Sequence, residues 1–400
     1  MQTSIIYKFN LISARGGGAL LVLLYSLYIF REYEESVANE FFYVFSLATV
    51  ISTLIKYGVE NWLLVNFPKI ADRSNLRARI EGRLLFNLGF LSIISSTVVI
   101  YLNETVWIEY YAILLGLTLS GYSTLCTVYQ AKSKVLLSIL LRNILPQLFF
   151  LILILLIEVN SVNELLKFFV IPYILLLFLF LIMGRRIIFF KIMSMKEVYR
   201  AVGRQHGYAV NSFSDALFSN FTVILIFLSG FSEYTSTYAI ASRFARVIRL
   251  LASTVTTYAT QDRTREFLII GHDLFVNSIL KTSIQLFIFN MLAAMICMIV
   301  IYGLNLYEVV VMDFNLVNVS IFIFIIFAEA IYSVYLSLLN FFLVTNNVNK
   351  ISLALLSLIL ILGGGALLAD NAVSISVSAL LISIVCCIYC VVLISMGVRK

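Results

Sequence analysis

Residues 316–342 read LVNVSIFIFIIFAEAIYSVYLSLLNFF, a continuous apolar run interrupted by one acidic residue, Glu329. About 20 consecutive apolar residues are enough for an α-helix to cross the hydrocarbon core of a bilayer. The strands of a membrane β-barrel would instead alternate apolar and polar side chains, which this run does not do. The stretch therefore predicts a transmembrane helix with a carboxylate near its middle.

The rest of the chain has the same character. Its 400 residues are 62% hydrophobic and only 12% charged, and their mean hydropathy is +1.01. Soluble domains carry about 25% charged residues, so the composition excludes an ordinary soluble protein. We expect an all-α polytopic membrane protein with about 12 transmembrane helices. The predicted spans are 11–30, 37–57, 84–102, 107–130, 135–157, 165–184, 207–229, 235–256, 275–302, 316–342, 351–369 and 373–396.

The basic residues predict how these helices are oriented. With a cytoplasmic N-terminus, the two long basic loops at 66–83 and 185–206 fall inside, while acids such as Glu158, Glu233 and Glu308 fall outside. This asymmetry follows the positive-inside rule and places both termini in the cytoplasm. The net charge of +7 therefore reflects membrane orientation, and we expect no nucleic-acid partner. The basic loops are expected to contact anionic membrane lipids.

The second basic loop divides the predicted spans into six and six. We predict an N-terminal six-helix lobe at 1–184, a basic cytoplasmic amphipathic linker at 185–206 and a C-terminal six-helix lobe at 207–400. Transporters built from two such halves hold their substrate at the interface between the halves. We therefore expect two lobes around a central cavity, with little room for a catalytic domain outside the membrane.

Charged side chains inside predicted spans are the candidates for function, because a charge at mid-bilayer costs several kcal/mol. Three arginines recur at every third position of one predicted helix, and such a stripe is expected to face water rather than lipid. Guanidinium groups match phosphate geometry, and nearby polar and aromatic groups suit sugar hydroxyls. The candidate substrate-binding residues are Arg15, Lys56, Arg142, Arg243, Arg246, Arg249, Tyr238 and Asn211.

Several charged residues within the predicted spans have an alternative explanation. Arg15, Lys56 and Arg249 lie close enough to the inner interface for their long side chains to snorkel to it. Asp215 and Glu329 are candidates for binding a coupling proton or sodium ion, but each could simply neutralise an arginine in a buried pair. The five cysteines lie within spans and no nucleotide-binding motif is present, so we expect no metal and no cofactor. An H⁺ or Na⁺ gradient, or the gradient of the substrate itself, remains as the energy source.

The segment 228–244, LSGFSEYTSTYAIASRF, resembles the junction of helices seven and eight in bacterial polysaccharide (O-antigen-type) flippases. That family belongs to the multidrug/oligosaccharidyl-lipid/polysaccharide exporter (MOP) superfamily. Its members show a short glycine-containing outer turn followed by a tyrosine, small residues and a basic residue. The layout of twelve spans, inside termini and a basic central loop is similar to the family over the whole chain.

The resemblance implies a flippase of a bacterial inner membrane, active in polysaccharide or lipopolysaccharide O-antigen biosynthesis. Its substrate would be a polyprenyl-pyrophosphate-linked oligosaccharide, moved to the outer leaflet by alternating access, with other polysaccharide-assembly membrane proteins as partners. Arg15 and Arg243 match cavity positions of the family, whereas Lys56 replaces an arginine. A multidrug exporter of the same superfamily is one alternative. An integral-membrane polysaccharide polymerase or ligase is the other, and it would be an enzyme, which we do not expect here.

Overall fold

The computed structural model describes residues 2–61, 107–131, 135–159, 161–184, 195–249, 272–306, 316–344, 348–366 and 371–397, and no strand occurs among them. Predicted span 84–102 lies outside these residues, and span 235–256 is described only to residue 249. The first helices are α1 (Gln2–Glu32), α2 (Glu35–Lys56), α5 (Trp107–Ala131), α6 (Val135–Ile139), the π-helix η1 (Leu140–Ile144), α7 (Leu145–Leu156) and α8 (Val162–Gly184). They are followed by α9 (Met195–Leu228), the 3₁₀ turn η2 (Ser232–Tyr234), a helix over 235–249, α11 (His272–Leu306), α12 (Leu316–Val344), α13 (Val348–Ala366) and α14 (Ala372–Gly397).

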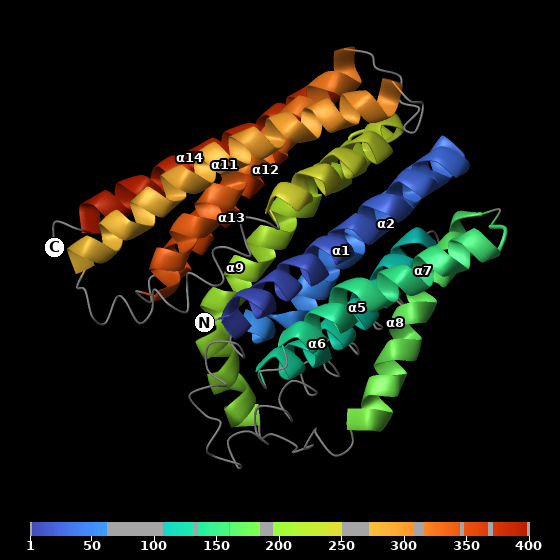
Figure 1. Cartoon of the computed structure of the whole chain (residues 1–400), viewed down its shortest axis with the longest axis horizontal. Coiled ribbons are helices and arrows are strands. Elements are labelled where there is room, and N and C mark those ends of the chain that lie inside the picture. The colour runs from blue at the N-terminus through green and yellow to red at the C-terminus, as the bar shows by residue number, and fades with distance from the viewer. Residues whose placement is uncertain are drawn as a thin grey trace. The chain divides into compact units, whose positions relative to one another are not determined.

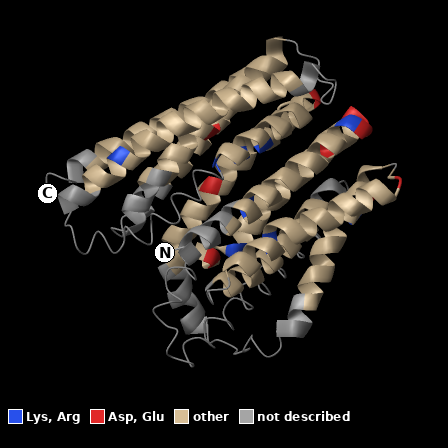
Figure 2. Cartoon of the chain, viewed as in Figure 1, with Lys and Arg blue, Asp and Glu red and all other residues tan. Residues whose placement is uncertain are grey.

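Most of these helices are long and apolar enough to cross a bilayer. Nine candidate spans lie within the described part of the chain, and the shorter apolar stretch Leu353–Gly365 lies in α13. Charged residues are sparse along them (Figure 2). The predicted all-α, multi-pass membrane fold is thereby confirmed. Helix α9 begins at Met195, so the end of the predicted linker is continuous with predicted span 207–229.

The chain divides into two compact units. One contains Met1–Leu21 and Glu40–Asn220, and the other contains Val22–Asn39 and Phe221–Lys400. The boundaries fall inside α1, α2 and α9, so each of these helices contributes residues to both units. The predicted lobes at 1–184 and 207–400, and the cavity between them, stay predictions.

The core of the first unit is aromatic. Phe41 of α2 stacks on Phe150 of α7 at a centroid distance of 6.0 Å, and the ring of Phe169 of α8 meets Phe150 edge-on at 4.7 Å. All three rings are fully buried. Offset and edge-to-face pairs of this kind stabilise packing beyond the burial of their area, and here they fix three helices against one another.

The second unit is organised around α12, which packs against α11, α13 and α14 (Figure 1). The side-chain amide of Asn290 in α11 donates to the hydroxyl of Ser333 in α12. The thiol of Cys387 in α14 donates to the carbonyl of Ile331 in α12 at 3.3 Å. Small polar groups commonly join helices in this way in membrane proteins.

Candidate functional site: two clusters of charged residues

The first cluster lies in the first unit and centres on a carboxylate. Glu60 Oε1 lies 3.4 Å from Lys56 Nζ, and Glu60 Oε2 lies 3.2 Å from Arg142 Nη2. The side chains of Lys56 and Glu60 are 13% and 16% exposed. One carboxylate therefore serves two cations, and the three residues together carry a net charge of +1.

Local backbone geometry explains why Lys56 and Arg142 meet at Glu60. Helix α2 ends at Lys56, and Glu60 follows one helical turn later in the sequence. Arg142 lies in η1, where the Leu145 N–H donates to the Leu140 carbonyl five residues earlier. Pro146 has no N–H to donate to the carbonyl of Arg142, so an ordinary α-helical bond cannot form there. A π-turn is a usual response to such an interruption and often marks a functional position.

The turn at Tyr57 and Gly58, which directly precedes the helical residues with Glu60, is held against α9. Gly58 has a φ of 69°, and a Cβ at this position would lie 2.4 Å from the backbone nitrogen of Ala209. Beside it, the Tyr57 hydroxyl lies 3.0 Å from His206 Nδ1, and Asn61 Nδ2 donates to Ser212 Oγ at 2.9 Å. The predicted residues Asn211, which is buried, and Asp215, which is half-buried, lie on the same part of α9.

The second cluster lies in the second unit, along the helix over 235–249. Arg243 is 4% exposed, and its Nε donates to the hydroxyl of Ser26 in α1. Arg249 Nη1 lies 3.6 Å from Glu329 Oε2 of α12, and its guanidinium lies over the Tyr332 ring at 5.1 Å. Stacking on an aromatic face adds to the ion pair and orients the guanidinium.

The arginines at 243, 246 and 249 share one side of their helix, as their spacing predicted. Arg243 and Arg249 lie about 9 Å apart along the helix axis, and Arg246, which is half-buried, lies between them. Glu329 is 4% exposed and is paired with Arg249. Within the described residues, this cluster thus holds three guanidinium groups and one carboxylate.

The structure brings some predicted residues together and separates others. Lys56 meets Arg142 at Glu60, and Glu329 meets Arg249. Arg15 is half-buried in α1 and belongs to the first unit. Tyr238 is fully buried, and its hydroxyl donates to the carbonyl of Ala372. The substrate-binding and ion-coupling roles of all these residues stay predictions.

Sequence reasoning missed three participants in these clusters. Glu60 was detectable, because it follows Lys56 at the i,i+4 spacing at which opposite charges pair on a helix. Ser26 and Tyr332 gave no such signal, because they meet their arginines through tertiary contacts. The described residues contain no group of three or more His, Cys, Asp and Glu side chains that could hold a metal ion.

Comparison with known proteins gives a consistent result at the level of the fold. No protein family model matches the sequence, and no curated protein matches it. Among solved structures, a mutant of a MATE transporter from Vibrio cholerae matches with a TM-score of 0.62 and 12% identity, over 98% of this chain and 96% of that chain. A multidrug resistance MATE family transporter of the MOP superfamily matches in its inward-facing conformation with a TM-score of 0.59, and an outward-facing conformation matches with 0.58. Both are 12% identical to this chain, over 98% of it and 95% of the other.

The fold is that of the MATE transporters. The MATE fold covers nearly the whole chain, which agrees with about twelve predicted helices. The matched MATE proteins are described as transporters, and that description concerns those proteins. The inward-facing and outward-facing neighbours are described as members of the MOP superfamily, which is also the superfamily of the resemblance seen in the sequence. Membership of the flippase family within it stays a prediction.

Proposed function

We propose that the protein is a membrane transporter that moves an amphipathic organic substrate by alternating access. The observation that carries this proposal is the MATE fold over nearly the whole chain, matched by both inward-facing and outward-facing structures. Alternating access needs two conformations with different access to the substrate. A chain with this fold is suited to transport by such a mechanism.

The comparisons favour multidrug export, in which the substrates are organic drugs. The inward-facing and outward-facing neighbours are described as multidrug resistance transporters, and this reading was the alternative in the sequence analysis. At 12% identity the likeness concerns the fold, and the fold alone does not select a substrate.

The charges of the two clusters favour a different substrate, a polyprenyl-pyrophosphate-linked oligosaccharide that is flipped between leaflets. Lys56 and Arg142 share one carboxylate, and three arginines accompany Glu329 in the second cluster. Both clusters therefore carry more positive than negative charge among the described residues. Guanidinium groups bind phosphate oxygens through paired, charge-assisted hydrogen bonds, so this surplus suits a pyrophosphate.

The energy source belongs to the same proposal. We infer that an H⁺ or Na⁺ gradient drives transport and that Asp215 or Glu329 binds the coupling ion. Glu329 is paired with Arg249, so an ion that binds Glu329 has to compete with a guanidinium. Transport that is indifferent to collapsed H⁺ and Na⁺ gradients would remove the role of both acids.

A reconstitution experiment with two substrates decides between the classes. Purified protein in liposomes is tested for accumulation of a fluorescent organic cation and for movement of a fluorescent polyprenyl-pyrophosphate disaccharide between leaflets. If the protein flips the disaccharide and Arg243→Gln reduces the rate at least tenfold, the result supports the second cluster as the anion site. The matched control is Arg31→Gln, because Arg31 is exposed at the outer end of α1 and its loss should change nothing.

Other outcomes have equally definite meanings. Accumulation of the cation without flipping of the disaccharide supports multidrug export. Unchanged flipping in the Arg243→Gln protein excludes that guanidinium from binding the pyrophosphate. Movement of neither substrate by correctly folded protein would contradict the proposed function in both forms.

A further inference from the structure

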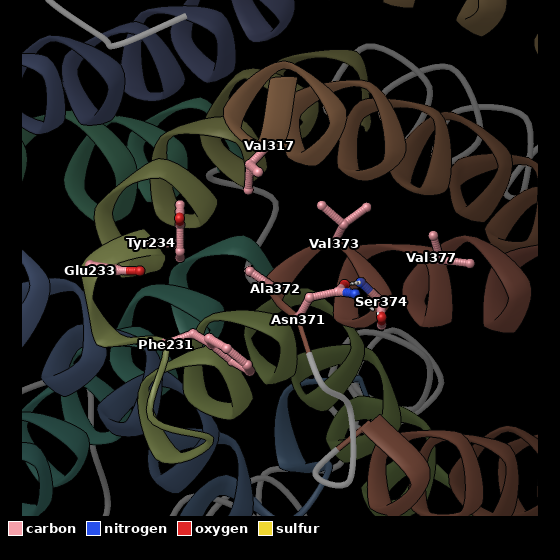
Figure 3. Close-up of a pocket in the computed structure, with 9 residues that line it drawn as sticks. All are labelled: Phe231, Glu233, Tyr234, Val317, Asn371, Ala372, Val373, Ser374 and Val377. Carbon is pink, nitrogen blue, oxygen red and sulfur yellow. Dashed lines mark hydrogen bonds between the residues drawn. The ribbon is translucent and has the colours of Figure 1, made fainter. Parts of the chain in front are cut away.

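A pocket lies in the second unit, where three helices have ends that are predicted to face outward. It has a volume of about 620 Å³ and is lined by nine described residues, among them Phe231, Glu233, Tyr234, Val317, Asn371 and Ser374. Pockets that bind small organic molecules usually have volumes of about 300–1,000 Å³. Figure 3 shows the residues around η2 on one side, the start of α14 on the other, and Val317 of α12 between them.

Both sides of this pocket are held in place by hydrogen bonds. Helix α9 ends in a turn in which Gly230 has a φ of 84°, and the Phe231 N–H donates to the Ile226 carbonyl at 3.2 Å. This pairing is typical of a Schellman cap, and it fixes the residue that follows the glycine. Across the pocket, Asn371 Oδ1 accepts bonds from the backbone N–H and the hydroxyl of Ser374 at 2.9 and 2.7 Å. The lining is therefore a built surface rather than a gap between loose ends.

The two sides are also connected below the pocket. The hydroxyl of Tyr238, one helical turn beyond Tyr234, donates to the carbonyl of Ala372. Tyr238 is fully buried, so this bond is protected from competing water. It sets the separation between η2 and the start of α14, and with it the width of the pocket.

The chemistry of the lining combines aromatic rings with negative charge. Phe231 and Tyr234 contribute aromatic rings, four residues are aliphatic, and Glu233 is the charged residue among the nine described lining residues. Ring faces attract organic cations, and quaternary ammonium groups are bound in aromatic cages in this way. A nearby carboxylate strengthens that attraction, whereas it would repel an anion.

The surroundings of the pocket are negative as well. Burial, followed by the charges of Glu233 and of Glu35 at the start of α2, raises the pKa of the Tyr234 phenol. The second cluster, which contains Arg243, Arg246 and Arg249, and this pocket thus carry charge of opposite sign.

We propose that this outer pocket binds an organic ammonium group, with Phe231 and Tyr234 contacting its apolar part and Glu233 providing the counter-charge. The ammonium can come from a free amphipathic cation or from the headgroup of a zwitterionic phospholipid in the outer leaflet. The inference does not depend on the proposed function, because the pocket can bind an ammonium whatever the protein transports.

The test uses a cysteine at the rim of the pocket as a reporter. Val317→Cys protein is placed in phosphatidylglycerol liposomes and treated from outside with a cationic trimethylammonium thiosulfonate or an anionic sulfonate thiosulfonate. We expect the cationic reagent to react about tenfold faster relative to the anionic one than it does at a control cysteine, and Glu233→Gln to remove most of this preference. The control is Asn163→Cys, which reports the general surface potential from the exposed start of α8.

Two further arms distinguish the sources of the ammonium. Protection of Val317→Cys by added benzyltrimethylammonium indicates a site for free cations. Protection when phosphatidylethanolamine replaces part of the phosphatidylglycerol, beyond any change at Asn163→Cys, indicates a lipid headgroup. Either protection supports the proposal if Glu233→Gln abolishes it and Glu158→Gln, an exposed acid of the other unit, does not. The proposal would be overturned if Val317→Cys showed no preference for the cationic reagent, or if neither benzyltrimethylammonium nor phosphatidylethanolamine protected it.

Discussion

Glu60 has the most consequential electrostatic environment among the described acids. Its two oxygens face two different cations, Lys56 at 3.4 Å and Arg142 at 3.2 Å. Burying any of these charges alone would be costly, and each is tolerated because its neighbours compensate it. The Glu60 carboxylate cancels one of the two positive charges, so the three residues keep a net charge of +1. The carboxylate thus stabilises Lys56 and Arg142 but also weakens their attraction for an anion. Glu60 therefore holds Lys56 and Arg142 together, and any role in anion binding stays a prediction.

We predict that Glu60→Gln destabilises the protein, because it leaves two partly buried cations without a carboxylate. The expected loss is about 2–4 kcal/mol, seen as a fall of several degrees in the temperature of unfolding in detergent. Glu60→Gln combined with Arg142→Gln should recover most of this loss, because one cation is then removed. Exposed Glu158→Gln serves as the control. Purely additive losses in the double variant would show that the three charges are not coupled.

At the level of elements, the turn after α2 decides how the first charged cluster is placed. Tyr57 and Gly58 both have positive φ angles, and Gly58 lies directly against the backbone of α9. Left-handed backbone costs about 1–2 kcal/mol for a residue with a side chain. The bond of Tyr57 to His206 and that of Asn61 to Ser212 compensate this cost and attach the turn to α9.

We predict that Gly58→Ala disrupts this attachment, since its methyl group would require both a strained φ and a displaced α9. The expected cost is about 2 kcal/mol or more, measured as the temperature of unfolding and as a loss of transport. Gly303→Ala is the matched control. Gly303 lies in α11 with nothing within 4 Å of an added Cβ, so alanine there should be neutral or slightly stabilising. Equal behaviour of the two variants would contradict the role given to the turn.

At the level of the whole molecule, the distribution of charge predicts the orientation in the membrane. Basic residues concentrate in the segments 66–83 and 185–206, which are predicted to lie inside, and acids concentrate in the segments that are predicted to lie outside. Orientation follows this bias because positively charged loops are retained in the cytoplasm. The proposed outer pocket depends on the same assignment, because its helix ends are predicted to face outward.

We predict that cysteines replacing Glu158 and Glu233 react with a membrane-impermeant thiol reagent in intact cells. A cysteine replacing Lys196 should react only after the membrane is permeabilised. The parent protein is the control for background labelling, because its five cysteines are buried or half-buried in the described helices. The reverse labelling pattern would invert the topology and place the ammonium pocket on the cytoplasmic side.

The amount of the fold that is predictable from the sequence follows from how local the signal is. The predicted span 316–342 nearly coincides with α12 (Leu316–Val344), because apolar length alone determines a membrane helix. The spacing of Arg243, Arg246 and Arg249 predicted one helical stripe, because the helical period is also a local property of the sequence. The start of α1 at Gln2 and of α9 at Met195 lay outside that signal, because polar helical turns beyond the hydrocarbon core carry no excess of hydropathy.

The sequence by itself determined that this is a helical membrane protein and how charge is distributed along its predicted spans. Only the tertiary structure decided which charges meet. Arg142 finds its carboxylate at position 60, and Arg249 finds its carboxylate at position 329. The pocket likewise joins residues 231–234, 317 and 371–377. Hydropathy and helical period act over a few turns of one chain segment, whereas these contacts depend on how distant helices pack, and no local pattern records that packing.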